Sequence, residues 1–356
     1  MTMITGSSTI RARLELREES LSPFASRSKE SKGRLRHESP CPIRTSFQQD
    51  SDRIVHCKAF RRLKHKTQVF IAPHGDHYAT RLTHTIEVSQ IARTITRALN
   101  LNEDLSESIA LGHDLGHTPF GHIGEQVLDN LSPFGFRHSQ QSLRVVDYLE
   151  HSGVGLNLTW EVRDGIINHS KSVDDIQGNE STMPATLEGQ VCRIADGIAY
   201  INHDIDDAIR RGVITASDLP YSAMEILGYT HSERIDTMVQ DVIESSRIQD
   251  RIISLSTPVR NAANILRQFL FRKVYLPSSE TKEAKNAQNT ILTLYEYFFS
   301  HFDFLPSEYT IHAISTEQGA MDYIAGMTDR FALRTAIQIN PTLDTITGTY
   351  DHIGPI

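Results

Sequence analysis

Hydrophobic residues recur at helical spacing along most of the chain from about residue 44 onward. In residues 80–99, Val88, Ile91, Ile95 and Leu99 lie three or four positions apart, as on the inward face of an amphipathic helix. Similar spacing predicts further helices over 103–115, 121–131, 136–152 and 187–212, and several between 220 and 335 with a break near 277–279. Strand signals are few, and 67–71 is the best candidate. We therefore expect an all-α protein.

The same pattern divides the chain into four parts. Residues 1–43 are rich in Ser, Arg, Glu and Pro without sustained periodicity, which predicts an irregular basic arm. Residues 44–215 form the predicted catalytic core, and residues 216–339 a helical C-terminal region packed on it. A polar loop is expected at 171–184 and a loose tail at 340–356.

Charge and composition narrow the class of protein. The 356 residues carry a net charge of −8, but residues 1–66 hold 15 basic and 7 acidic side chains and are therefore positive. A basic arm favours handling of anions; the alternative is a solvated arm or one that pairs with a neighbouring subunit. The chain has no run of 18 apolar residues, no apolar signal segment at its start and no paired cysteine pattern. We expect a cytoplasmic protein without a membrane span.

Histidines point to metal chemistry, because nine of the 17 fall between His56 and His138. The strongest local signal is G-H-D-L-G-H at 112–117. Neighbouring side chains diverge by about 100° on a helix, so His113 and Asp114 can share a metal ion only at a helix end or bend, which Gly116 can supply. His84 faces inward on the preceding helix and is a third candidate ligand, or else a hydrogen-bonded core histidine.

A fourth ligand is expected from a distant helix. Asp196 lies among Ile194, Ala195 and Ile198, where a carboxylate is costly unless it is paired or bound to metal. The alternative is a salt bridge to an arginine such as Arg193. Two imidazoles and two carboxylates suit a divalent ion of the Mn, Fe, Zn or Mg group.

Other side chains are candidates for acid–base and substrate roles. His122 and Glu125 share a helix face, so the carboxylate can orient the imidazole, and His117 and His138 are further candidates. Asp196, Tyr200, Asp204 and Asp207 form a polar line along one helix. From Asp196 to Asp204 this line covers about 12 Å, the reach of a nucleoside sugar and polyphosphate. A solvated acidic face is the alternative.

A basic stretch at 52–70, together with Arg81, supplies cations for phosphate binding. Arginine suits this role because its planar guanidinium binds phosphate oxygens in a bidentate manner. The chain has neither G-x-x-x-x-G-K-[ST] nor G-x-G-x-x-G, so P-loop and Rossmann nucleotide sites are not indicated.

Taken together, these motifs resemble the HD-domain metallohydrolases, and more narrowly the deoxyguanosine triphosphate triphosphohydrolase-like family. The resemblance is dense from about 44 to 212, with one further block, D-Y-I-A-G-M-T-D-R-F-A, at 322–332. It implies an HD-domain fold with added C-terminal helices. Ser51 and Phe331 stand where Arg and Tyr are expected.

The resemblance also implies roles for individual residues. The metal ligands would be His84, His113, Asp114 and Asp196. His122 and Glu125 would be the catalytic pair near the α-phosphate, and His138 would assist the leaving group. Gln68 and Arg81 would contact the sugar and α-phosphate, while Tyr200 and Asp204 would recognise the 3′-hydroxyl of a deoxyribose and exclude a 2′-hydroxyl. The implied reaction converts a dNTP and water to a deoxynucleoside and inorganic triphosphate.

Two other functions remain open at this point. One is an HD-type phosphohydrolase acting on another nucleotide; the other is a nucleotide-sensing or single-stranded nucleic-acid-binding protein with weak catalysis, which the basic arm suggests. The resemblance further implies a homo-oligomer and activation by a second dNTP. Neither the preferred base nor the physiological metal follows from the sequence.

Overall fold

The fold is made of helices connected by turns and by longer irregular segments. The computed structural model describes residues 9–71, 78–170, 175–178 and 182–343, and within these ranges it contains no strand. Thr67 forms an isolated bridge with Thr80, so the expected strand at 67–71 is wrong. The predicted all-α fold is confirmed. No helix in the described ranges has both the length and the apolar character needed to cross a membrane.

The helices of the described part follow one another as two groups. The first group comprises α1 (Ile10–Glu18), α2 (Ser46–His56), α3 (Lys58–Arg62), α4 (Arg81–Ala98), α5 (Glu103–Gly112), α6 (Gly121–Leu131), α7 (His138–Arg144), α8 (Glu150–Gly153), α9 (Trp160–Asn168) and α10 (Leu187–Arg210). The second group comprises α11 (Tyr221–Leu227), α12 (His231–Ser245), α13 (Thr257–Leu270), α14 (Leu276–Ser279), α15 (Lys282–Ser300), α16 (Ser307–Thr310), α17 (Thr316–Ala325) and α18 (Asp329–Ile339).

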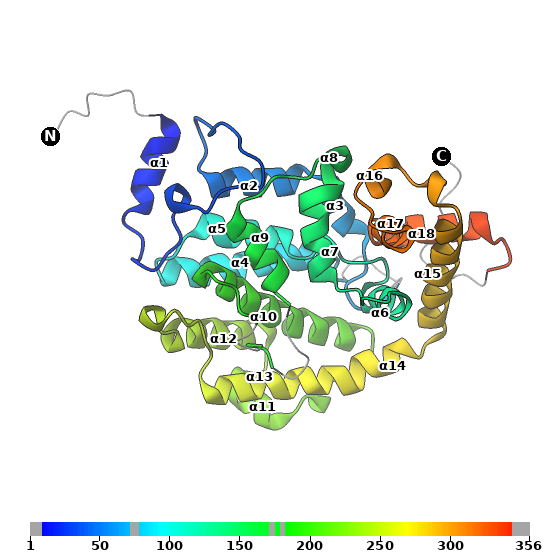
Figure 1. The fold of residues 1–356 in the computed structure, drawn as a ribbon. Helices are drawn as coiled ribbons and strands as arrows, with labels where there is room; N and C mark the ends of the chain where they lie inside the picture. The colour runs from blue at the N-terminus through cyan, green and yellow to red at the C-terminus, as the bar shows by residue number, and fades with distance from the viewer. Residues whose placement is uncertain (1–8, 72–77, 171–174, 179–181, 344–356) are drawn as a thin grey trace.

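A central bundle places the predicted site. Helix α4 packs against both α5 and α10, and α9 packs against α5 and α10, so the apolar faces of these four helices share one core. In Figure 1, α11, α12 and α13 lie along one side of α10, while α15, α17 and α18 lie at one end of the molecule beside α6. The C-terminal helices therefore contact both the long helix α10 and the helix that carries His122 and Glu125.

The N-terminal arm differs from its prediction. Residues expected to be irregular include the helix α1, whose N-cap Thr9 accepts a hydrogen bond from the Ala12 amide. The arm is also bound to the core, because the Ser26 amide and hydroxyl donate to the buried Glu188 of α10. Local capping and these long-range hydrogen bonds supply the order that periodicity did not indicate.

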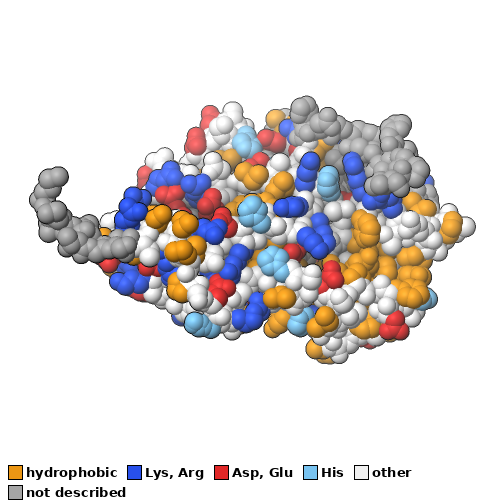
Figure 2. Space-filling view, turned by 90° about the horizontal axis from the view of Figure 1, so that it is seen from above, with side chains coloured by type: hydrophobic (Ala, Val, Ile, Leu, Met, Phe, Trp, Pro, Cys, Tyr) orange, Lys and Arg blue, Asp and Glu red, His pale blue; other side chains and the backbone are white. Residues whose placement is uncertain are grey.

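Some of the basic side chains in the arm and at the start of the core form ion pairs within the chain. Arg34 pairs with Asp50, Arg53 with Glu38, and Arg44 with Asp52. On the face drawn in Figure 2, Lys and Arg side chains are interspersed with Asp and Glu side chains near the N-terminal end. The positive count of residues 1–66 therefore does not produce an unbroken basic surface there, which weakens the argument for nucleic-acid binding.

Helix boundaries show where periodicity was reliable. Residues 121–131 match α6, and 80–99 matches α4 closely. The helix expected over 136–152 is interrupted: it becomes α7, a π-helical turn at Val145–Leu149 and α8, in which His151 and Ser152 have positive φ. Helix α9 was not predicted. Part of the loop expected at 171–184, and most of the tail expected at 340–356, lie outside the described residues.

Candidate metal and phosphate site

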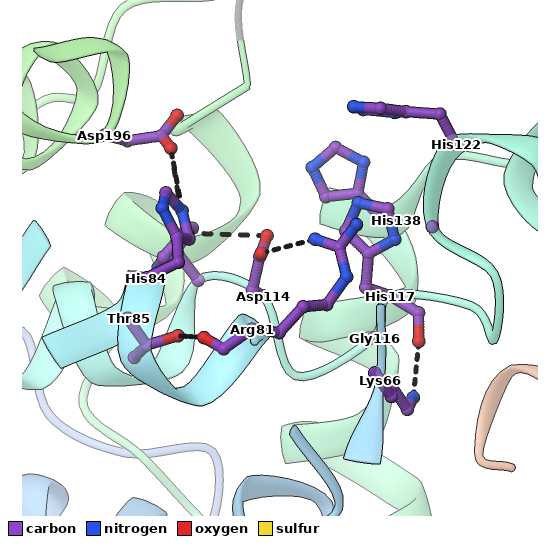
Figure 3. Close-up of polar contacts among 12 residues, drawn as sticks. Lys66, Arg81, His84, Thr85, Asp114, Gly116, His117, His122, His138 and Asp196 are labelled. Carbon is purple, nitrogen blue, oxygen red and sulfur yellow. Dashed lines mark hydrogen bonds and ion pairs between the residues drawn. The ribbon is translucent and has the colours of Figure 1, made fainter. Parts of the chain in front are cut away.

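Four side chains from three regions of the central bundle converge. His84 lies on α4 and Asp196 on α10, whereas His113 and Asp114 follow the end of α5. His84 Nε2 lies 3.2 Å from Asp196 Oδ1 and 3.3 Å from His113 Nε2. His113 Nε2 lies 3.5 Å from Asp114 Oδ1. Figure 3 shows His84, Asp114 and Asp196 of this group close together. Because α5 ends at Gly112, two adjacent side chains can point to one place, as the sequence argument required.

The donor set fits a divalent metal ion. His113 Nδ1 donates to the Ala110 carbonyl at 2.6 Å, so Nε2 is the ring nitrogen that faces His84 Nε2 and the carboxylates. Burial lowers the pKa of His84, so this imidazole is neutral at pH 7. Burial raises the pKa of Asp114, but the nearby His113 and Arg81 charges outweigh it and hold this pKa well below its usual range. Lone pairs and carboxylate oxygens packed this closely are stabilised by a cation between them.

Arg81 connects this group to a second region. Its Nη1 donates to Asp114 Oδ2 at 2.8 Å, while its Nε and Nη2 are buried without a hydrogen-bond partner. Gln68 Oε1 is likewise buried and unpaired. Gly121 lies against both: a Cβ there would stand 3.2 Å from Arg81 Nη2 and 3.2 Å from the Gln68 carbonyl oxygen. Buried polar atoms without partners mark this region as a place for a polar ligand.

The acid–base candidates lie next to Arg81 but pair differently from the sequence prediction. Glu125 accepts hydrogen bonds from the His138 amide at 2.8 Å and from His138 Nδ1 at 2.9 Å. His122 Nδ1 lies 3.7 Å from Glu125, and the side chain of His122 is 73% exposed. His117 stacks on His138 with ring centroids 4.5 Å apart. The sequence spacing that paired Glu125 with His122 missed the closer contact, because His138 approaches from the next helix.

Electrostatics separates the two buried histidines of this cluster. Burial lowers the pKa of His138, but the Glu125 charge outweighs it and the pKa of His138 lies above its ordinary value. Burial, together with the Arg81 and His138 charges, holds the pKa of His117 well below its ordinary value. His117 is therefore neutral at pH 7, whereas the Glu125 carboxylate favours the charged form of His138.

Sequence reasoning missed a further histidine in this cluster. His169, at the end of α9, donates from Nδ1 to the Ile166 carbonyl at 2.6 Å. Its Nε2 is then an acceptor, and it lies 3.1 Å from His138 Nε2. Burial, with the His113 and His138 charges, lowers the pKa of His169 to about 3. Only its position after a short apolar segment could have singled it out.

Tyr200 and Asp204 of α10 are held by helices of the C-terminal group. Tyr200 Oη accepts from Arg267 Nε at 2.6 Å, and the Tyr275 hydroxyl donates to Asp204 Oδ2. Asp204 Oδ1 also lies 2.7 Å from His203 Nδ1. Arg267, Tyr275 and His203 were not among the predicted site residues. No motif in the sequence marked Arg267 or Tyr275, since their contacts with α10 depend on how α13 and the following π-helical turn pack beside it.

Two segments of the chain match models of known protein families. Residues 81–201 match the HD domain, and residues 253–338 match the phosphohydrolase-associated domain. The matched HD segment contains all four converging side chains. The matched associated segment contains Arg267 and Tyr275.

Similar whole proteins are named deoxyguanosinetriphosphate triphosphohydrolase-like proteins. One from Caldanaerobacter subterraneus subsp. tengcongensis is 57% identical over 90% of this chain and 92% of its own length. One from Desulfatibacillum aliphaticivorans is 52% identical over 91% of this chain and 96% of its own. One from Clostridium perfringens is 50% identical over 87% of this chain and 91% of its own length. From this similarity, and from a chain that carries both matched domains, we conclude that the protein belongs to the deoxyguanosinetriphosphate triphosphohydrolase-like family of HD-domain phosphohydrolases.

Proposed function

We propose that the protein hydrolyses deoxynucleoside triphosphates to a deoxynucleoside and inorganic triphosphate, with a divalent metal ion held by His84, His113, Asp114 and Asp196. The observation that carries this proposal is the position of Arg81. One of its nitrogens pairs with a candidate metal ligand, while two others are buried and unpaired beside Gln68. A phosphate group between the metal site and Arg81 would satisfy those donors.

The metal ion, when bound, would polarise the phosphoryl oxygens and the attacking water. Its four proposed ligands suit Mn, Fe, Zn or Mg. Arg81 would offset charge that develops on the α-phosphoryl oxygens, which is the main requirement in phosphoryl transfer. Gln68, which like Arg81 lies close to Gly121, would contact the sugar.

Proton delivery would come from the histidine cluster. The bond from the α-phosphorus to the 5′-oxygen breaks, and that oxygen must receive a proton as the deoxynucleoside leaves. His122 is the exposed member of the cluster, with its Nδ1 3.7 Å from Glu125, so it is the proposed proton donor. His138 is held between Glu125 and His169 and would supply a fixed positive charge next to the leaving oxygen. His117 would support the His138 ring by stacking.

The sugar would lie toward Tyr200 and Asp204. The Arg267–Tyr200 and Tyr275–Asp204 hydrogen bonds fix both side chains, so the space beside them has a defined shape. A fixed wall can reject a 2′-hydroxyl by crowding, which would favour dNTPs over NTPs. Dependence on oligomer formation, and activation by a second dNTP, remain predictions from the family resemblance.

Product analysis tests the proposal. Metal-loaded protein is incubated with each dNTP and NTP, with and without a second dNTP, in ¹⁸O-labelled water, and the products are separated by chromatography. We expect inorganic triphosphate that carries the label and an unlabelled deoxynucleoside. His122→Ala, loaded with the same metal, is the matched control for contaminating phosphatases. A first product of dNMP or dNDP would contradict the proposal and favour another HD-type phosphohydrolase; binding of single-stranded DNA without turnover would favour the nucleic-acid alternative.

A further inference from the structure

Asp329 is a buried carboxylate of the C-terminal group that reaches the catalytic region. It begins α18 and is 1% exposed. Its Oδ1 accepts from the Phe120 amide at 3.0 Å. Its Oδ2 accepts from the Thr67 amide at 3.0 Å and also from the Thr67 hydroxyl. One side chain thus joins two chain segments that lie more than 50 positions apart in the sequence.

Both segments lead directly to proposed site residues. Thr67 precedes Gln68, and Phe120 is the N-cap of α6, two positions before His122. Phe120 and Gly121 have φ of 60° and 58°. A left-handed backbone costs roughly 1–2 kcal/mol at a residue with a side chain, so Phe120 needs a contact that holds it there. The hydrogen bond from its amide to Asp329 is such a contact.

Neighbouring contacts strengthen the same connection. Lys66 Nζ donates to the carbonyls of His117 at 2.5 Å and Ala325 at 2.7 Å (Figure 3 shows the first). Arg62 Nη1 donates to the Gly326 carbonyl at 3.0 Å. Hydrogen bonds of Arg62, Lys66 and Asp329 therefore link three segments, 62–67, 117–120 and 325–329.

We propose that Asp329 is a positioning residue, through which the C-terminal helices fix the backbone at Gln68 and at the start of α6 in the geometry that hydrolysis needs. The expected effect of Asp329 on catalysis rests on the proposed function. The block at 322–332, which the proposed chemistry leaves without a role, then has one: its Asp329 orders two site segments without touching substrate.

The test uses two pairs of variants in the full chain. Asp329→Asn replaces an acceptor oxygen by an amide that cannot accept from Phe120 and Thr67 together. Its matched control is Asp50→Asn, because Asp50 is also fully buried and accepts from the amide of a threonine, Thr159, at 2.8 Å and from its hydroxyl at 2.6 Å. The second pair is Thr67→Val, which removes the hydroxyl donor, and Thr67→Ser, which keeps it.

Hydrogen–deuterium exchange and kinetics are measured on each variant, together with metal content and Tm. We expect Asp329→Asn to exchange faster than wild type in peptides covering 64–70 and 117–124, and to lose at least tenfold in kcat/KM, mainly through kcat, with unchanged metal content. Asp50→Asn should lower Tm without either effect. Thr67→Val should lose kcat/KM in the same direction, and Thr67→Ser should recover it.

Each outcome decides a separate question. The positioning role would be overturned if Asp329→Asn showed the same hydrogen–deuterium exchange as wild type at 64–70 and 117–124. It would also be overturned if Asp329→Asn exchanged faster there but kept the kcat/KM of wild type. Equal losses in Asp329→Asn and Asp50→Asn would also overturn it, because general destabilisation would then explain the kinetics. If wild-type protein hydrolyses no dNTP, the proposed function fails, but the exchange experiment still reports whether Asp329 orders these segments.

Discussion

His84 Nδ1 lies 2.8 Å from His203 Nε2, on the opposite side of the ring from the atom that faces the other candidate ligands. His203 Nδ1 in turn lies 2.7 Å from Asp204 Oδ1. If His84 offers Nε2 to a metal, its Nδ1 must carry the proton and donate to His203. The second imidazole would then fix the orientation of His84 and increase its strength as a ligand.

We predict that His203→Phe weakens metal binding by roughly 10–100-fold, because the ring cannot accept the His84 proton. Competition with a chelating dye measures the metal Kd directly, without reference to activity. His231→Phe is the matched control, since His231 also pairs with a carboxylate of α10, Asp206, but lies away from the metal site. An unchanged Kd in His203→Phe would show that the contact with His84 has no effect on the metal.

Asp114→Asn should lose bound metal and nearly all activity while the helical fold is retained. The substitution keeps the shape of the side chain but removes an anionic ligand and the charge that holds Arg81 Nη1. Elemental analysis after dialysis measures the metal, and circular dichroism measures the helix content. A variant with full metal content and turnover would contradict the assignment of Asp114 as a ligand.

His122→Ala should lose activity while it keeps its bound metal. His122 lies outside the group of converging ligand atoms, so the variant should keep its metal. It should lose roughly 10²–10⁴ in kcat, the usual contribution of one general acid–base group. Loss of metal from His122→Ala would mean that the division between ligands and proton donors is wrong.

The sequence predicted the parts of this site that depend on local order, and missed those that depend on packing between distant helices. His113 and Asp114 were placed at a helix end because Gly116 and their own adjacency limited the choices. By contrast, Glu125 was paired with His122 on its own helix, whereas the structure adds His138 from α7 at hydrogen-bond distance. His169 and Asp329 act through contacts with residues more than 30 positions away, which periodicity cannot indicate.

Two neighbouring carboxylates at the start of α5 should respond to pH with opposite signs. Burial raises the pKa of Asp104 to about 6, above its value of about 3.9 in an unfolded chain. Its contribution to stability is therefore full below about pH 4 and is lost as the pH rises to about 6, by at most about 3 kcal/mol. Asp104→Asn should raise Tm at pH 7.5 and leave it unchanged near pH 4.

Glu103 provides the control for that experiment. Hydrogen bonding to Arg97 lowers the pKa of Glu103, so its ion pair stabilises the protein above its unfolded pKa and is lost on acidification. Glu103→Gln should therefore lower Tm slightly at pH 7.5, since partly exposed pairs contribute about 0.2–1 kcal/mol. Scanning calorimetry at both pH values measures the two effects. Shifts of the same sign in both variants would argue against burial as the cause at Asp104.

Selection of dNTPs over NTPs should depend on the ring of Tyr200 more than on its hydroxyl. The ring of Tyr200 packs against the hydrophobic core, and crowding by this ring is the proposed reason that a 2′-hydroxyl is rejected. Tyr200→Phe keeps the ring and should keep most of the preference. Tyr200→Ala removes the ring and should reduce the ratio of kcat/KM for dGTP to kcat/KM for GTP by tenfold or more, which corresponds to about 1.4 kcal/mol. Because the ratio compares two substrates on the same protein, a loss of stability in Tyr200→Ala cancels. The same ratio in wild type, Tyr200→Phe and Tyr200→Ala would show that the sugar is selected elsewhere, and the placement of the deoxyribose against α10 would be wrong.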